Sequence, residues 1–274
     1  MKFLQKIFLL TVFIFQLNPS FAAIKVTPTL IELDANNAKG DYLTTSFMVQ
    51  AENDETIRFK LYPEYFTITD EGKMNSIVDS KNKDNLVPHV RFVPNEFTLK
   101  NGSKQLVRVT FTDLKNLPEG ESRMVMFIED VKAKEIMLPN KTQNINTRLI
   151  VKTRLGIPFY VDKGRYVKAG SFDNLEVMQN EKNLVYKIDL SSKGNSKIRY
   201  TGKGQIIQND NLVGEFRLNG NTVRGGGIFS ETKALPENLK EGSYTLRVIL
   251  TYKNEKGENK NLIKETPFTI TDSI

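Results

Sequence analysis

Apolar side chains recur at every second position in most of the chain, which is the period of a β-strand with one buried face. In the segment 97–111, large apolar residues alternate on both sides of the pair Asn101-Gly102. Asn and Gly tolerate the positive φ angles of a tight turn, so this pair between two alternating runs is a strong hairpin signal. The sequence therefore predicts a β-hairpin over Phe97–Phe111.

Similar short runs continue to the end of the chain, and no amphipathic helix longer than about three turns interrupts them. Around 162–171 the alternation gives way to charged, glycine and small residues, and a new set of strands follows. We therefore predict an all-β protein with two immunoglobulin-like antiparallel β-sandwich domains in tandem, at 23–161 and 162–274. The polar segment Asp70–Asn85 is interpreted as a long exposed loop or an extra hairpin.

A more specific pattern of the immunoglobulin-like sandwich occurs at Gly242–Leu246. Tyr244 follows a turn at the start of a late strand, and Leu246 stands two residues later, where antibody domains have a cysteine. This spacing is typical of a tyrosine corner, in which the tyrosine hydroxyl bonds back to the backbone. The alternative is an ordinary surface tyrosine on a strand.

The first 22 residues have the pattern of a secretory signal peptide. Lys2 and Lys6 precede the apolar run Ile7–Phe15, and small residues at 20 and 22 suit a cleavage site. The apolar run is too short to span a membrane, and no later segment approaches about 18 consecutive apolar residues. We expect the mature chain to be exported to the periplasm, or alternatively secreted, without insertion into a membrane.

Composition and charge limit the kinds of catalytic, metal-binding and nucleic-acid-binding site that the chain can form. The chain contains no Cys, which excludes disulfides, thiol catalysis and zinc–thiolate sites. The net charge is +7, but basic and acidic residues are interleaved, as in Lys253–Glu258, which indicates solvated loops rather than a nucleic-acid-binding patch. His89 is the only histidine, and Arg224–Gly227 lacks the Gly-Lys-Ser/Thr ending of a phosphate loop. We expect no catalytic residues, no metal and no cofactor.

The segment Ile145–Ile157 has one apolar face and one polar, cationic face. Its odd-numbered positions are mostly large and apolar, whereas its even-numbered positions include Arg148, Lys152 and Arg154. Two interpretations fit one long strand of this kind. It is either a core strand whose apolar face is buried in its own sandwich, or an edge strand that offers this face to a partner by β-augmentation.

Several motifs resemble the periplasmic chaperones of pilus assembly by the chaperone–usher route, the PapD-like family. The similar segments are Phe97-x-Leu99 with Gly102, Gln105 and Val107-Arg108-Val109, then Leu117-Pro118-Glu119 with Glu121-Ser122 and Phe127, and finally 153–160 (TRLGIPFY). Together they follow the order and spacing of that family, and the resemblance covers roughly Ile24 to Tyr160.

This resemblance implies two immunoglobulin-like domains set at an angle, and a function without catalysis. Such chaperones lend a long strand to an incomplete pilin-like subunit, whose missing strand it replaces, and an outer-membrane usher is a further expected partner. On this resemblance Ile145–Ile157 is the donor strand, and the side chains that contact the partner are Thr147, Leu149, Val151 and Leu155.

Two positions depart from the family's pattern. The family anchors the terminal carboxylate of its subunit with an arginine on the first strand and a lysine near the end of the long strand, where this chain has Leu30 and Gly156. Arg154 lies on the same strand face as Gly156, and its guanidinium suits bidentate carboxylate binding. We therefore expect Arg154, assisted by Lys152 or Lys25, to take this role.

Two other functions fit the same sequence. A secreted tandem sandwich with a structural or adhesive role would bury the apolar row of 145–157 in its own core. A hydrolase or carbohydrate-binding sandwich would need paired carboxylates or exposed aromatic residues in one cleft, and the absence of Trp argues against the sugar-binding version. The main expectation is a periplasmic chaperone that donates a strand.

Overall fold

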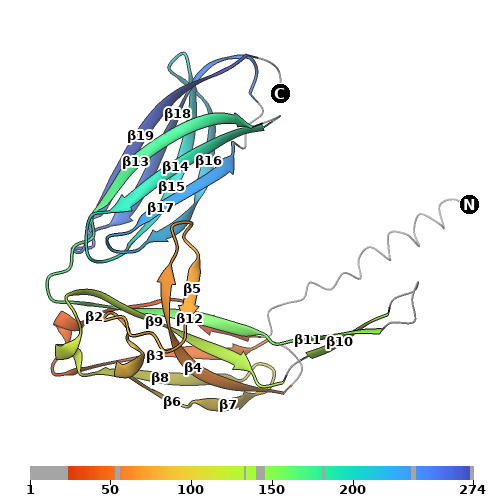
Figure 1. Ribbon diagram of the computed structural model, residues 1–274, viewed down its shortest axis with the longest axis vertical. Coiled ribbons are helices and arrows are strands. Elements are labelled where there is room, and N and C mark those ends of the chain that lie inside the picture. The colour runs from red at the N-terminus through yellow and green to blue at the C-terminus, as the bar shows by residue number, and fades with distance from the viewer. Residues whose placement is uncertain are drawn as a thin grey trace, which may run out of the picture.

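The structure is a computed structural model that describes residues 24–52, 56–132, 134–139, 146–180, 183–235 and 239–271. The predicted signal peptide, 1–22, lies outside these residues. Figure 1 shows two β-sandwiches in tandem, the first coloured red to green and the second green to blue. The predicted all-β fold is confirmed. No helix in the described ranges is long and apolar enough to cross a membrane.

The first sandwich consists of two sheets and three short 3-10 helices. Its strands are β1 (Ile24–Thr27), β2 (Ile31–Asp34), β3 (Tyr42–Ala51), β4 (Ile57–Ile68), β5 (Met74–Ile77), β6 (Val90–Val93), β7 (Glu96–Leu99), β8 (Lys104–Thr112), β9 (Gly120–Asp130) and β12 (Arg154–Lys163). The 3-10 helices are η1 (Ala35–Asn37), η2 (Val87–His89) and η3 (Leu114–Asn116). One sheet has the order β1-β3-β8-β6 and the other β2-β12-β9-β4-β5, with β7 also paired to β4.

Alternate residues of both sheets meet in one apolar core, which includes Phe47, Val109 and Phe159. The first strand changes sheets at Pro28, because β1 runs antiparallel to β3 whereas β2 runs parallel to β12. An opening strand shared between the two sheets, with the last strand beside it, is an arrangement of immunoglobulin-like sandwiches.

The second sandwich has its own core, which includes Tyr200, Leu246 and Leu250. Its strands are β13 (Gly170–Asn180), β14 (Asn183–Ser192), β15 (Ile198–Gln208), β16 (Asn211–Val223), β17 (Ile228–Ala234), β18 (Gly242–Lys253) and β19 (Asn259–Ile270). They form the antiparallel sheets β13-β14-β17 and β16-β15-β18-β19. This is again the two-sheet arrangement of an immunoglobulin-like domain.

The tyrosine corner predicted in the second sandwich is confirmed. The hydroxyl of Tyr244 donates a hydrogen bond of 2.9 Å to the backbone oxygen of Lys240. Leu246, two residues later, is completely buried in the core. An apolar side chain therefore fills the position that a cysteine has in antibody domains.

The hairpin predicted over Phe97–Phe111 is wrong, although its turn forms. Gly102 has a φ of 72°, and the N–H of Ser103 donates to the carbonyl of Lys100. The flanking strands, however, belong to different sheets, because β7 pairs with β4 whereas β8 pairs with β3 and β6. Leu99 and Val107 consequently point into the same core from opposite sheets, and both apolar rows contribute to that core.

The segment Asp70–Asn85 forms the extra hairpin that was one of its two interpretations. β5 pairs antiparallel with the end of β4, from Ile68 opposite Met74 to Tyr65 opposite Ile77. Figure 1 shows this β4–β5 hairpin, coloured orange, reaching from the first sandwich to the lower end of the second.

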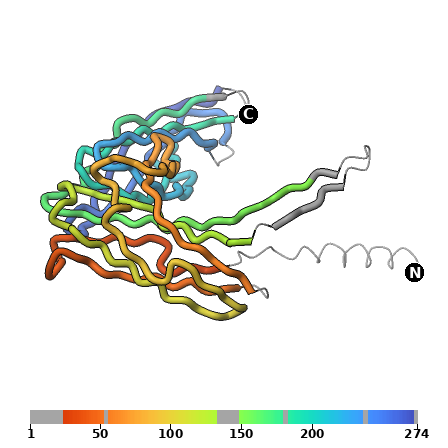
Figure 2. The backbone as a smooth tube through the Cα atoms, turned by 60° about the horizontal axis from the view of Figure 1, so that its bottom comes forward, coloured from red at the N-terminus to blue at the C-terminus, as the bar shows by residue number. Residues whose placement is uncertain are grey.

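The long strand predicted over Ile145–Ile157 is interrupted. The structure has β11 (Asn146–Val151), then a break at Lys152-Thr153, and then β12. β11 pairs with β10 (Lys134–Pro139), and these two strands form an arm that projects from the first sandwich in Figure 2. The break coincides with the end of β9, after which the N–H of Val131 donates to Arg58 instead of continuing the ladder with β12. Ile145 lies outside the described residues.

Candidate partner-binding strand and cleft

β11 and β12 present an unpaired strand edge. One side of β12 is paired with β9 along its whole length, and one side of β11 is paired with β10. On the opposite side, the ladder with β2 begins only at Phe159. Among the described residues, the edge from Asn146 to Pro158 therefore has no neighbouring strand, and its backbone groups are available to another chain.

Apolar side chains of this segment are exposed beside the free edge. Leu149 is 45% exposed and Leu155 is 40% exposed, and Val151 is half-buried. Ile157, by contrast, is buried in the core of the first sandwich. Along this segment, the apolar side chains therefore change from buried at Ile157 to exposed at Leu155. For Thr147 the structure gives the backbone pairing with Leu138.

Sequence reasoning missed one apolar residue of the arm. Ile150 is a large apolar residue on the face that is otherwise polar and cationic, and it is 60% exposed. In a two-stranded ribbon neither face is covered by a second sheet, so side chains on both faces reach solvent. The alternating pattern of the sequence carries no signal for this, because it indicates two faces but not whether a second sheet covers either one.

Lys152 and Arg154 already contact groups of the first sandwich. Lys152 forms an ion pair with Glu129 and donates a hydrogen bond to it, and the hydroxyl of Tyr62 donates a second one. The bond from Lys152, and to a lesser extent that from Tyr62, holds the pKa of the Glu129 carboxyl below its ordinary value. The guanidinium of Arg154 lies 4.1 Å from the centre of the Phe127 ring, and its Nη1 is 3.8 Å from Oε1 of Glu64. Because Tyr62 contacts both Arg154 and Glu129, the two cations belong to one polar cluster, on the face of the sheet that carries Phe127 and points away from the core.

Lys25 and Gly156 complete the positions that the sequence singled out. Lys25 is exposed on β1, in the other sheet from Lys152 and Arg154, so the structure does not join it to their cluster. Gly156 packs closely, since an added Cβ would lie 2.8 Å from Cγ2 of Val125. No side chain as long as lysine fits here without displacing Val125.

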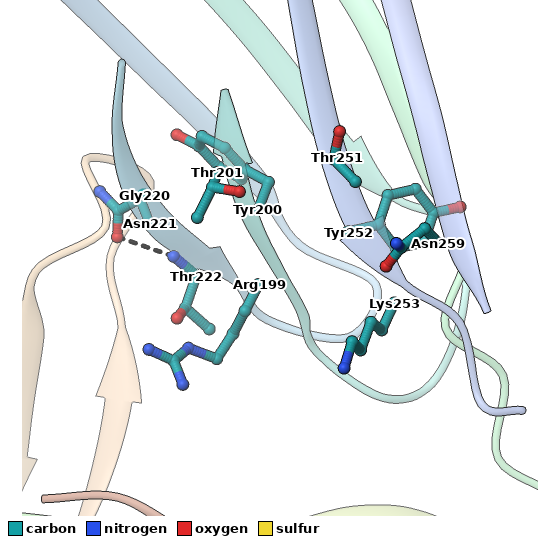
Figure 3. Close-up of a pocket in the computed structure, with 10 residues that line it drawn as sticks. All are labelled: Arg199, Tyr200, Thr201, Gly220, Asn221, Thr222, Thr251, Tyr252, Lys253 and Asn259. Carbon is teal, nitrogen blue, oxygen red and sulfur yellow. Dashed lines mark hydrogen bonds between the residues drawn. The ribbon is translucent and has the colours of Figure 1, made fainter. Parts of the chain in front are cut away.

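The second sandwich carries a basic pocket on its side toward the first sandwich, which sequence reasoning missed. A pocket of about 460 Å³, which we call the cleft pocket, is lined from β15, β16, β18 and the start of β19, and Arg199 and Lys253 are among its residues. Figure 3 shows both cationic groups extending to the same side, toward the first sandwich. An adjoining pocket shares these two residues and adds both cations and carboxylates, namely Lys168, Lys197, Glu32 and Glu255. None of the described carboxylates forms an ion pair with Arg199 or Lys253.

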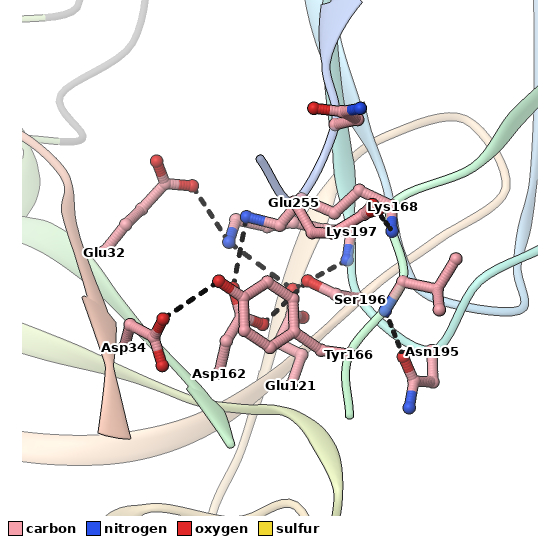
Figure 4. Close-up of polar contacts among 12 residues, drawn as sticks. Glu32, Asp34, Glu121, Asp162, Tyr166, Lys168, Asn195, Ser196, Lys197 and Glu255 are labelled. Atoms are coloured by element: carbon pink, nitrogen blue, oxygen red, sulfur yellow. Dashed lines mark hydrogen bonds and ion pairs between the residues drawn. The ribbon is translucent and has the colours of Figure 1, made fainter. Parts of the chain in front are cut away.

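A buried charge cluster joins the two sandwiches where the connection between them begins (Figure 4). Lys197 is almost completely buried, and its Nζ lies 2.9 Å from Oε1 of Glu32 and 3.5 Å from Oε2 of Glu121. The same Nζ lies 3.8 Å from the centre of the Tyr160 ring. The backbone N–H of Lys197 donates to Glu121, and the hydroxyl of Ser196 donates to Asp162.

The pKa values of the two carboxyls around Lys197 shift in opposite directions. Burial raises the pKa of Glu121 above its ordinary value, although Lys197 and Arg123 oppose this change. Glu32 is also penalised by burial, but its attraction to Lys197 prevails and holds its pKa below the ordinary value. No pattern in the sequence indicates this cluster, because its members lie far apart along the chain and each has ordinary polar neighbours.

Comparison with known proteins finds similar folds at low sequence identity. The chain is similar to a structure from a chaperone–tip adhesin complex of CFA/I fimbriae biogenesis, with 18% identity over 89% of this chain and 99% of that chain and a TM-score of 0.43. It is also similar to the class 5 fimbriae chaperone CfaA (17% identity, 89% and 98% covered, TM-score 0.46) and to the Pseudomonas aeruginosa CupB2 chaperone (11%, 88% and 98%, 0.43). No family model matches the chain, and no curated protein matches it.

Proposed function

We propose that the protein is a periplasmic chaperone that binds incomplete pilin-like subunits by donating the free edge of β11 and β12. The observation that carries this proposal is the unpaired edge from Asn146 to Pro158 with Leu149 and Leu155 exposed beside it. A subunit that lacks a strand needs backbone groups to complete its sheet and apolar side chains to fill its groove. This edge supplies both.

The side chains proposed to enter the partner's groove are Thr147, Leu149, Val151 and Leu155. Full burial of a large apolar side chain contributes roughly 1.5–3 kcal/mol relative to exposure. Loss of rigid-body freedom and ordering of the arm offset part of this gain. A row of three large apolar side chains together with strand pairing therefore supports a stable complex.

The exposed row favours a chaperone over a structural or adhesive protein built from tandem sandwiches. A protein of the second kind would bury the row in its own core, whereas here, among the row's side chains that the structure describes, only Ile157 is in the core. The proposed reaction is binding and release without covalent chemistry. It requires no cofactor.

Two sets of cations are candidates for binding the terminal carboxylate of a partner. Arg154 and Lys152 belong to the segment with the free edge, but they already contact Glu64 and Glu129, and Lys25 stands apart from them on β1 of the other sheet. Arg199 and Lys253 line the cleft pocket without a carboxylate partner among the described residues. The second pair pays no cost of breaking an existing ion pair, which favours it as the anchor.

Co-purification tests strand donation. We expect Leu149→Glu plus Val151→Glu to abolish recovery of secreted subunits with the protein, because two charges would enter an apolar groove. Leu212→Glu plus Ile263→Glu, at exposed positions of the second sandwich, is the matched control and should retain the partner. A folded Leu149/Val151 variant that still carries the same partner would show that this edge is not the binding site.

A peptide corresponding to the last residues of a co-purified subunit tests the anchor. Arg199→Ala should weaken binding of the peptide with a free carboxylate and leave binding of the amidated peptide unchanged. Arg154→Ala is the parallel variant, and the variant with the larger loss identifies the anchor. If neither variant distinguishes the two peptides, the cations do not bind a terminal carboxylate.

Cell fractionation tests the localisation. It should find the full chain in the periplasm and a chain without residues 1–22 in the cytoplasm.

A further inference from the structure

The β4–β5 hairpin is fixed rigidly to the first sandwich at its base. Phe66 and Ile68 of β4 are buried against Val125 and Tyr160, on the outer face of the sheet. The rings of Phe66 and Tyr160 meet edge to face with their centres 5.5 Å apart. Aromatic packing of this kind leaves the hairpin little freedom to tilt relative to its own sandwich.

The tip of the hairpin is held in one conformation by its own hydrogen bonds. The N–H of Thr69 donates to the carbonyl of Lys73 and the N–H of Gly72 to the carbonyl of Thr69, each at 2.9 Å. The hydroxyl of Thr69 donates to Glu71 at 2.7 Å. Gly72 has a φ of 74°, which favours glycine at this position. Because its base is packed and its tip is hydrogen-bonded, the hairpin extends from the first sandwich as a rigid element.

The tip contacts the second sandwich through its backbone. The N–H of Ser230, on β17, donates a hydrogen bond of 2.8 Å to the carbonyl of Asp70. Gly72 packs against Asn221 so closely that an added Cβ would lie 2.3 Å from Nδ2 of that side chain. Asn221 in turn lines the cleft pocket, and Figure 3 shows it beside the hairpin at the edge of that pocket.

This contact is separate from the one at the connection between the sandwiches. There, the N–H of Glu121 donates to the carbonyl of Asn195, and Lys197 is held by Glu32 and Glu121. Figure 1 shows the connection at the left of the molecule and the orange hairpin tip to the right of it. A single contact allows two rigid bodies to rotate about it, whereas two separated contacts oppose that rotation.

We propose that the β4–β5 hairpin is a clasp that holds the two sandwiches at a fixed angle. It does so through the pairing of Asp70 with Ser230 and the close approach of Gly72 to Asn221. Since the hairpin stands beside the cleft pocket, release of the clasp changes the separation between Arg199 and the first sandwich. This inference concerns the conformation of the chain alone and does not depend on the proposed function.

Distances between spin labels test the clasp. The chain contains no Cys, so Lys104→Cys and Asn211→Cys introduce one specific label on an exposed site of each sandwich. Gly72→Asn should broaden and shift the distance distribution, because asparagine accepts a positive φ but its Cβ displaces Asn221. Gly102→Asn is the matched control, with a φ of 72° and nothing near its Cβ, and should leave the distribution unchanged.

A second pair of variants addresses the hydrogen bond. Ser230→Pro removes the N–H that Asp70 accepts, whereas Ser230→Ala removes only the hydroxyl, which donates to Asp189. The clasp requires a broader distribution for Ser230→Pro than for Ser230→Ala. If Ser230→Pro does not fold, the comparison of Gly72→Asn with Gly102→Asn decides alone. Distributions that match the parent chain in folded Gly72→Asn overturn the proposal.

Discussion

The ammonium group of Lys197 in the second sandwich lies 2.9 Å from a carboxylate oxygen of Glu32 in the first. With Glu121 at 3.5 Å, one buried lysine joins two carboxylates from two different strands, β2 and β9. A buried charge of this kind is tolerated only while its partners remain in place. The cluster therefore links the stability of each sandwich to the contact between them.

Lys197→Met should destabilise the protein by about 3 kcal/mol, because Glu121 stays buried with only Arg123 to balance its charge. Urea unfolding measures the loss. Lys203→Met is the control, since Lys203 and Glu215 form an exposed pair that solvent screens, so its loss should have little effect on stability. Equal losses in the two variants would show that the buried cluster does not stabilise the fold.

Glu121→Gln and Glu32→Gln should change the pH dependence of stability in opposite directions. The folded-state pKa of Glu121 is raised above 4.5, so the stability that this carboxyl contributes is present below its unfolded pKa and is lost as pH rises through the folded pKa. The folded-state pKa of Glu32 is lowered below 4.5, so its contribution is present above the unfolded pKa and is lost as pH falls through the folded pKa.

Urea unfolding from about pH 3 to about pH 7 checks this contrast. Glu121→Gln should gain stability relative to the parent chain as pH rises, and Glu32→Gln should gain as pH falls. The second effect is the smaller one, because the side chain of Glu32 is 44% exposed and solvent screens its interaction with Lys197. Slopes of the same sign for both variants would contradict the assignment.

Gly156→Ala should destabilise the first sandwich by about 1–3 kcal/mol, since the new methyl group overlaps Val125 and approaches Phe127. Thermal and urea unfolding provide the measurement. Gly40→Ala serves as the comparison, because a Cβ there meets only the Tyr42 ring at 3.7 Å. A Gly156→Ala variant as stable as Gly40→Ala would show that the sheet adjusts freely at this position.

Tyr244→Phe should cost about 0.5–1.5 kcal/mol, because it removes the hydrogen bond to Lys240 from the tyrosine corner and leaves the packing on Phe268 intact. Tyr42→Phe, at a position that is 62% exposed, should be close to neutral. The prediction fails if the two variants have the same midpoint of urea unfolding.

The sequence pattern predicts which residues face a core better than it predicts which strands pair. Alternation correctly placed Val107, Val109 and Leu246 inside. It failed at 97–111, because two apolar rows joined by a tight turn can lie side by side in one sheet or face each other across a core. The second arrangement forms here, with Leu99 and Val107 on opposite sheets.

The candidate site shows the same limit. Exposure of Leu149 and Leu155 fits one of the two interpretations of their strand, but whether a second sheet covers them is decided by distant segments. Lys197 has the polar neighbours of a surface residue in the sequence, and only the approach of β2 and β9 buries it. Side chains whose roles depend on three separate segments leave no local pattern to read.

β2 gives the free edge of β12 a defined end. Because β2 runs parallel to β12 from Phe159 onward, another strand added beside β12 has no room to pair beyond Pro158. A strand that reaches this point must stop or leave the sheet. A shift of one residue reverses which side chains face a groove. The start of β2 therefore fixes the register in which any added strand can pair with β12.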